Sequence, residues 1–170
     1  MQAFYRAADA AGPVNRGHLD MHTAIRGSLY RQFALLPAHA GDFSPDFYQL
    51  LQASGMDAVV RHTEAGGTFT HFTCEKFAAQ SATLELGKVM PFGANDLSLF
   101  AAADAAIRAW IADAPLPPRD KAPVDYFLVE ESIIKREGEF TLNLAADVEN
   151  FTALPAGYEI ARQAEKRWVV

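Results

Sequence analysis

Cysteine is nearly absent from this chain. Among its 170 residues only Cys74 carries a thiol, which excludes an intrachain disulfide and a zinc site built from several cysteines. Histidine and carboxylate side chains must therefore carry any metal chemistry.

Long apolar runs are also missing. No stretch is long enough to cross a bilayer, and residues 1–17, MQAFYRAADAAGPVNRG, contain neither the apolar segment of a secretory signal nor a lipidation pattern. Half of the residues are hydrophobic and 21% are charged, which is typical of a soluble globular protein. We therefore expect a cytoplasmic protein that does not bind membranes.

The chain has no surplus of positive charge. It contains 15 Lys and Arg against 21 Asp and Glu, for a net charge of −6, and the basic residues are scattered along the sequence. This distribution argues against a nucleic-acid partner. A small anionic substrate remains compatible, because a single arginine can bind a carboxylate through two hydrogen bonds.

What the sequence does contain is an alternation of strand and helix patterns. Apolar alternation predicts strands over 18–24, 31–37, 57–62 and 81–87. Helical spacing and capping residues predict helices over 45–54 and 95–114. We also expect a short helix over 69–80, after the glycine pair Gly66 and Gly67. Strands that alternate with helices indicate an α/β architecture, in which helices cover a sheet whose strands can run in mixed directions.

The last of these helices has the strongest apolar pattern. Asn95 or Asp96 is available as its N-cap. Its buried face is expected to consist of Leu97, Phe100, Ala103, Ile107 and Ile111.

A segment rich in proline marks the best domain boundary. Residues 113–123, DAPLPPRDKAP, hold four prolines, which end a helix and stiffen a linker. We expect an α/β unit over 1–113 and a small β-rich domain over 122–170, in which a turn at Glu137 and Gly138 joins strands. The chain ends directly after the apolar residues WVV, so we expect this second domain to be truncated.

His18, Asp20 and His22 alternate along the first strand and so share one face. His22 stands at the strand end, where catalytic groups of α/β proteins cluster. It is either a metal ligand or a hydrogen-bonded histidine at the edge of the core. Asp20 either accepts a proton from a neighbouring imidazole or caps a loop.

Glu85 interrupts an apolar strand between Leu84 and Leu86. Its side chain either faces solvent on an edge strand or projects into a cleft with a raised pKa. In a cleft it could act as the general base that metal-assisted hydrolysis requires.

Other polar residues near these motifs have simpler interpretations. His71 and Glu75 stand at helical i, i+4 spacing, but without a further ligand the pair is typical of a solvated helix face. Gly66 and Gly67 allow a ligand to approach the backbone, although such glycines more often make a turn. No histidine of the chain starts an H-x-x-E pair, so the sequence contains no complete zinc site.

Three stretches carry a resemblance to a known family: HLDMHTAIRGS, GGTFTHF and ATLELGKVMPFGANDLSLF, in that order. They closely resemble the succinylglutamate desuccinylases of arginine catabolism by the succinyltransferase pathway, which are related to aspartoacylase and more distantly to zinc carboxypeptidases. The last two motifs separate this branch from aspartoacylase proper. The resemblance implies part of a mixed sheet of the zinc-carboxypeptidase type with flanking helices, followed by the small β-rich domain.

The resemblance also implies an activity and a cofactor. Members of the family use Zn²⁺ to hydrolyse N-succinyl-L-glutamate to succinate and L-glutamate. His22 matches their later histidine ligand, with Met21 in place of the usual leucine, and Glu85 matches their catalytic glutamate. Because this substrate carries several carboxylates, we predict that Arg26 and Lys88, which adjoin the two motifs, help to hold it.

The departure from the family is large. Its N-terminal half, with the H-x-x-E zinc ligands and an arginine-containing substrate motif, has no equivalent here, and one ligand of three holds zinc poorly. We therefore expect a piece of a longer enzyme or a truncated product, whose exposed sheet edges favour homo-oligomers. Two hypotheses stay open: a zinc amidohydrolase or its C-terminal part, and a non-catalytic binding or structural remnant. An acylase for a related N-acyl amino acid differs from the first only in its pocket.

Overall fold

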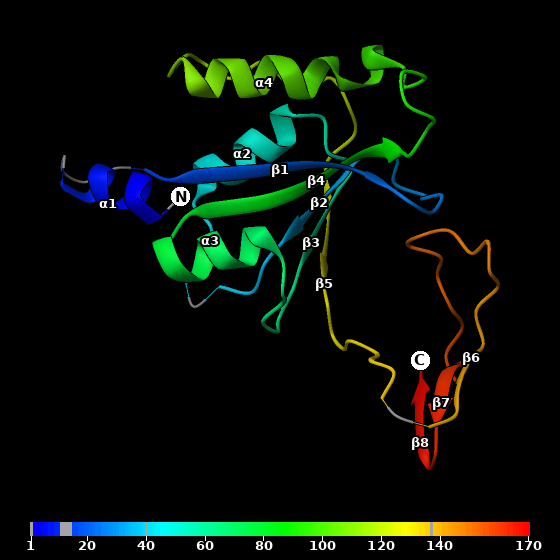
Figure 1. Ribbon diagram of the computed structural model, residues 1–170. Coiled ribbons are helices and arrows are strands. Elements are labelled where there is room, and N and C mark those ends of the chain that lie inside the picture. The colour runs from blue at the N-terminus through cyan, green and yellow to red at the C-terminus, as the bar shows by residue number, and fades with distance from the viewer. Residues whose placement is uncertain (1, 11–14, 40, 137) are drawn as a thin grey trace.

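Five strands form the main sheet, in the order β1-β4-β2-β3-β5 (Figure 1). The computed structural model describes residues 2–10, 15–39, 41–136 and 138–170. The strands are β1 (Gly17–Ala24), β2 (Phe33–Leu36), β3 (Ala58–Arg61), β4 (Gln80–Lys88) and β5 (Asp125–Leu128). β4 pairs with β1 in parallel and with β2 antiparallel, while β2, β3 and β5 run parallel to one another. The predicted α/β class with a mixed sheet is confirmed.

Helices cover both faces of this sheet. α2 (Pro45–Ala53) and α4 (Ala101–Ile111) lie on one face and α3 (Phe69–Phe77) on the other (Figure 1). α2 begins as the sequence predicts, because the Ser44 side chain accepts a hydrogen bond from the backbone N–H of Phe47 and Pro45 occupies the first turn.

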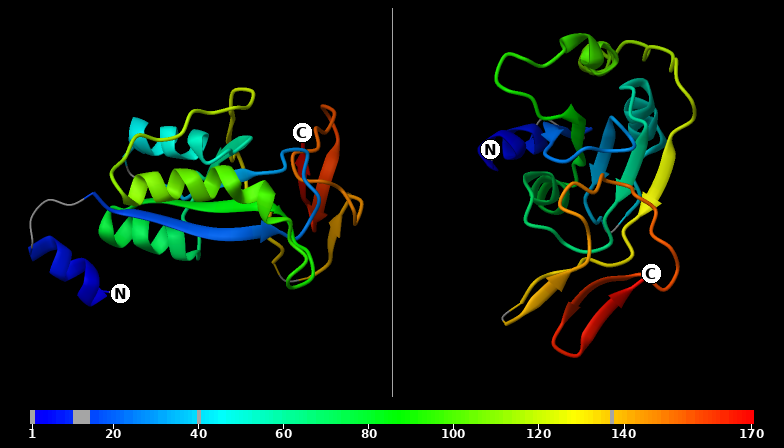
Figure 2. Two further views of the ribbon diagram at one scale, coloured as in Figure 1. Left: turned by 90° about the horizontal axis from the view of Figure 1, so that it is seen from above. Right: turned by 90° about the vertical axis from the view of Figure 1, so that its right-hand side faces the viewer.

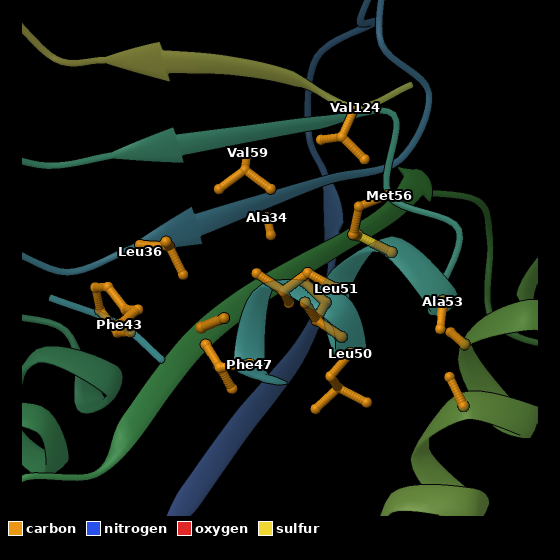
Figure 3. Packing of buried hydrophobic residues seen from close by; sticks show 14 of the residues in the cluster. Ala34, Leu36, Phe43, Phe47, Leu50, Leu51, Ala53, Met56, Val59 and Val124 are labelled. Carbon is orange, nitrogen blue, oxygen red and sulfur yellow. The ribbon is translucent and has the colours of Figure 1, made fainter. Parts of the chain in front are cut away.

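The main hydrophobic core lies between the sheet and the α2 face (Figure 3). Leu50 and Leu51 of α2 are fully buried there, against Leu84 of β4 and Val59 of β3. Because Leu84 points into this core, the alternation of the strand sends Glu85 to the opposite face of the sheet. The core therefore determines which face carries the candidate site.

The helix predicted over 95–114 differs from the expectation in its first turn and its buried face. A 3₁₀ helix, η1 (Leu97–Phe100), precedes α4, and the Asp96 side chain caps it. Of the predicted face, Ala103 is buried, and Phe100 and Ile107 are partly buried against the core. Leu97 and Ile111 are instead 73% and 77% exposed, and Ala106 is buried in addition. The small alanines allow α4 to approach the core closely, and the larger residues at its ends extend past that core.

An N-terminal helix, α1 (Gln2–Ala10), was not predicted. It contacts the rest of the chain through Tyr5, whose ring stacks on Phe77 of α3 with centroids 4.2 Å apart, and through an ion pair between Asp9 and Arg16. Neither a capping residue nor an acidic first turn announces this helix in the sequence.

The chain beyond the prolines contributes to two sheets. β5 pairs with β3 in the main sheet, and a second, antiparallel sheet follows. Its strands are β6 (Phe140–Leu142), β7 (Glu159–Gln163) and β8 (Lys166–Val169). This small sheet lies beyond one end of the main sheet (Figure 2). Glu137, half of the predicted turn, is outside the described residues, and positions 129–136 contain no strand.

None of the helices in the described ranges is long and apolar enough to cross a membrane.

Candidate active site

Two rows of polar side chains lie next to each other on β1 and β4. The parallel register pairs His18 with Ser81, Asp20 with Thr83, and His22 with Glu85. Residues two apart in a strand share a face, so both rows point to the side of the sheet that carries α3. His18, Asp20 and His22, which the sequence predicts to share a face, thus form one edge of a polar surface.

α3 closes the His18 end of this surface. His18 Nδ1 and Thr73 Oγ1 share a hydrogen bond of 2.8 Å, and Thr73 Oγ1 lies 3.0 Å from Ser81 Oγ. The ring of Phe69 packs edge-on against His18, and burial lowers the pKa of the His18 imidazole. His18 is therefore a hydrogen-bonded histidine at the edge of the core.

The other end of the two rows is open. The His22 side chain is 52% exposed, and its Nε2 lies 3.2 Å from Asp20 Oδ1. Glu85 is half-buried, and within the described residues its buried Oε2 has no hydrogen-bond partner. The pKa of the Glu85 carboxyl is raised, mainly by burial. The nearby His22 acts in the opposite direction, and Asp20 adds to the rise. Such an oxygen is available to a ligand or water.

A surface hollow at this open end brings some of the predicted residues together. His22, Glu85 and Arg26 all line it. Lys88 lines a different hollow, beside Gly27 and Asn95. The structure therefore groups three of the four predicted site residues and does not bring Lys88 to them.

The residues that line the same hollow also include His62 and Asn150. His62 follows β3, and Asn150 comes from the segment that joins β6 to β7 of the second sheet. His62 has a sequence signal, since it alternates with Val60, which also lines the hollow. Asn150 has none, because nothing near it in the sequence points to β1 or β4.

The remaining polar candidates lie on α3. His71 is buried, with its Nε2 3.6 Å from Glu75 Oε2, and lines a smaller pocket with Thr68 and Thr70. This pocket is next to the first hollow, because His62 lines both. The solvated-face interpretation holds for the exposed Glu75 but not for His71.

Cys74 does not take part in this surface. It is buried in the main hydrophobic cluster, and burial raises the pKa of its thiol to about 11. The thiol is therefore protonated at neutral pH and a poor nucleophile or metal ligand.

The donor set can be tested against a zinc site. A catalytic zinc site uses three protein ligands and one open position. Across the described ranges no three His, Cys, Asp or Glu side chains form a group that could hold a metal ion. The residues present thus fall short of a set of three ligands and do not fit zinc by themselves.

Comparison with known proteins identifies similar sequences over nearly the whole chain. A family model described as the succinylglutamate desuccinylase/aspartoacylase catalytic domain matches residues 3–111. A second model, the AstE/AspA barrel-sandwich hybrid domain, matches residues 122–170. A succinylglutamate desuccinylase of Photorhabdus laumondii is 47% identical over 155 residues, which cover 91% of this chain and 48% of that protein.

Solved structures agree with this comparison. The succinylglutamate desuccinylase of Vibrio cholerae superposes with a TM-score of 0.85 at 30% identity, over 99% of this chain and 50% of that one. The enzyme of Chromobacterium violaceum gives a TM-score of 0.76 at 37% identity, over 92% and 49%. The chain spans about half the length of the curated relatives it matches.

Proposed function

The chain belongs to the succinylglutamate desuccinylase/aspartoacylase family, and from this we propose that it forms the Glu85 half of an amidohydrolase site for N-succinyl-L-glutamate. The products would be succinate and L-glutamate, a step of arginine catabolism by the succinyltransferase pathway in the cytoplasm. The observation that carries the proposal is the parallel pairing of His22 with Glu85 at the hollow that Arg26 also lines.

Glu85 is the proposed general base and general acid. Its raised pKa and its free oxygen suit a group that accepts a proton and later returns it. The carboxylate takes a proton from the attacking water as oxygen bonds to the amide carbon. It then gives that proton to the amide nitrogen as the carbon–nitrogen bond breaks.

His22 is the proposed metal ligand. Its Nε2 faces Asp20, which leaves Nδ1 for a metal ion and orients the ring as carboxylate–histidine pairs do. A zinc ion bound there would polarise the amide carbonyl and acidify the water. The H-x-x-E ligands implied by the resemblance would have to come from sequence that this chain does not contain.

Arg26 is the proposed carboxylate anchor. A guanidinium group binds a carboxylate through two parallel hydrogen bonds, which orients the substrate as well as holding it. We retain Lys88 as a weaker, peripheral contributor, since it lines the neighbouring hollow.

A second candidate function has its own support. The absence of a three-ligand group among the described residues favours a non-catalytic role for this chain alone. An acylase for a related N-acyl amino acid would use the same Glu85 and His22 and differ only in the substrate contacts.

The decisive experiment measures zinc content and desuccinylase activity in two proteins. One is the 170-residue chain; the other is a fusion that places the N-terminal half of the Photorhabdus laumondii relative before it. We expect stoichiometric zinc and activity in the fusion, and loss of zinc from the fusion with His22→Ala. Full activity in the chain alone would refute the inference that its site is incomplete. A metal-loaded fusion without hydrolase activity would refute the proposed function.

A further inference from the structure

The segment 149–151 crosses from the second sheet to the candidate site. The backbone N–H of Asn150 donates to the carbonyl of Gly27 at 2.9 Å, and the N–H of Leu29 donates to the carbonyl of Asn150 at 3.2 Å. Ser28 and Asn150 thus form a parallel bridge. The chain between β6 and β7 can be followed back toward the main sheet in Figure 1.

Phe151 anchors this crossing. Its ring centroid lies 4.9 Å from that of Tyr30, 5.0 Å from that of Phe33 and 5.2 Å from that of Phe127. Four aromatic rings therefore hold the segment against the sheet, and edge-to-face contacts of this kind add to simple burial. The position of Asn150 is consequently set by packing on one side and by backbone hydrogen bonds on the other.

Asn150 has one polar group left for the hollow. Both of its backbone groups are used by Gly27 and Leu29, and it lines the same hollow as His22, Arg26 and Glu85. Its side-chain amide has no hydrogen-bond partner within the part of the chain that the structure describes. A half-buried amide without a partner can bind a ligand at little reorganisation cost.

We infer that Asn150 is a substrate-binding residue, whose side-chain amide donates a hydrogen bond to a carboxylate or carbonyl oxygen of the N-acyl amino acid. The inference rests on the proposed function and extends it to a residue from beyond the proline segment. An uncharged donor is useful here because Asp20 and Glu85 already bring negative charge toward an anionic substrate. Arg26 then binds through charge, and Asn150 through a directed N–H.

Binding to the 170-residue chain tests this directly. Labelled chain is titrated with millimolar N-succinyl-L-glutamate, and the NMR signals of the Asn150 side-chain NH₂ group are followed. We expect these signals to shift together with those of His22 and Arg26. Asn150→Ala and Asn150→Asp should raise the Kd about tenfold or more, with Asp the worse because its charge repels the ligand.

A matched control and a structural readout keep the test specific. Asn95→Asp makes the same chemical change in the neighbouring hollow and should leave the Kd unchanged. The backbone amide signals of Leu29 and residue 150 report whether the crossing survives each substitution. If a variant loses the crossing, its Kd is not used. The test then depends on whether the ligand shifts the Asn150 side-chain NMR signals in the unmodified chain.

The possible failures are distinguishable. If the ligand shifts His22 and Arg26 but neither the Asn150 side chain nor the Kd of Asn150→Ala responds, the inference is wrong and the proposed function stands. If no signal around the hollow shifts at millimolar ligand, either in this chain or in the fusion described above, both are wrong.

Discussion

At the scale of single residues, opposing effects act on the pKa of Glu85. Burial raises the pKa of its carboxyl, while His22, its partner in the β1–β4 register, lowers it. The net shift is upward, so the folded chain holds the proton more tightly than the unfolded chain does. The stability that this proton contributes is complete below the unfolded pKa and is lost as pH rises through the folded pKa.

Glu85→Gln is therefore expected to raise the melting temperature at neutral pH, because the amide mimics the protonated acid and avoids burying a charge. The difference should vanish at acid pH, where Glu85 is protonated in both states. Thermal unfolding followed by circular dichroism at both pH values measures this, with exposed Glu165→Gln as control. A stabilising effect that persisted unchanged in acid would contradict the assigned cause.

The same substitution is expected to lower kcat of the fusion described above about 100-fold or more, because general acid–base catalysis typically contributes that much. Steady-state kinetics, with zinc content measured in parallel, checks it. A normal kcat and a normal zinc content in Glu85→Gln would mean that Glu85 is not the general base.

Arg26→Ala in the fusion is expected to raise KM about tenfold, because one charge-assisted carboxylate contact is lost. Arg26→Lys should recover part of this, since lysine keeps the charge without the planar fork. Lys88→Ala should have the smaller effect, because Lys88 lines the neighbouring hollow. Equal KM values for Arg26→Ala and the parent fusion would mean that Arg26 does not bind the substrate.

At the scale of elements, local patterns located the strands and helices that build the polar surface. Alternation placed β1 and β4, and Ser44 caps α2 as predicted, because its side chain accepts the backbone N–H of Phe47. Thr68 caps α3 in the same way, by accepting the backbone N–H of His71, although Thr68 is not among the predicted caps. Such signals depend on neighbours within a few positions, which explains why a single sequence contains them.

Contacts between distant segments could not be predicted in this way. The pairing of β5 with β3 and the crossing at Asn150 join residues far apart in the sequence. Neither leaves a local pattern, because backbone hydrogen bonds do not depend on side-chain type. Leu97 and Ile111 differ from the expected buried face for a related reason, because how far that face extends depends on how the helix packs against distant elements such as α2.

The crossing itself gives a prediction. Phe151→Ala is expected to destabilise the fold by about 2 kcal/mol, below the usual cost for a fully buried phenylalanine because Phe151 is half-buried. Denaturant unfolding measures the loss, and amide exchange at Leu29 and Asn150 should accelerate. Phe92→Ala, at a fully exposed position, is the control and should change neither. Protection of both amides in Phe151→Ala would mean that the rings do not anchor the segment.

At the scale of the whole molecule, β1 is an edge strand. Its eight residues pair only with β4 among the described strands. Open edges of this length recruit other strands. Met21 on β1 is also 64% exposed, and Ile25, directly after β1, is exposed as well.

We expect the isolated chain to self-associate through this edge, and Met21→Lys to shift it toward the monomer, because a charge on an edge strand opposes pairing. Sedimentation velocity over a range of concentrations measures this. Met90→Lys changes an exposed methionine outside β1 and should leave association unaltered. A monomer at all concentrations would show that the edge is not a contact surface.

The β1–β4 register has a consequence for changes in chain length. One residue inserted between Asp20 and His22 would turn His22 to the core face, while two would restore its direction and displace it by about 6.6 Å along β4. Insertions in β1 should therefore be tolerated by the fold with a period of two. The distance between His22 and Glu85, in contrast, changes with any insertion in one strand alone. It is restored only when the other strand carries a matching insertion. Length variation in this region should accordingly arise in pairs, or be confined to the loops on either side.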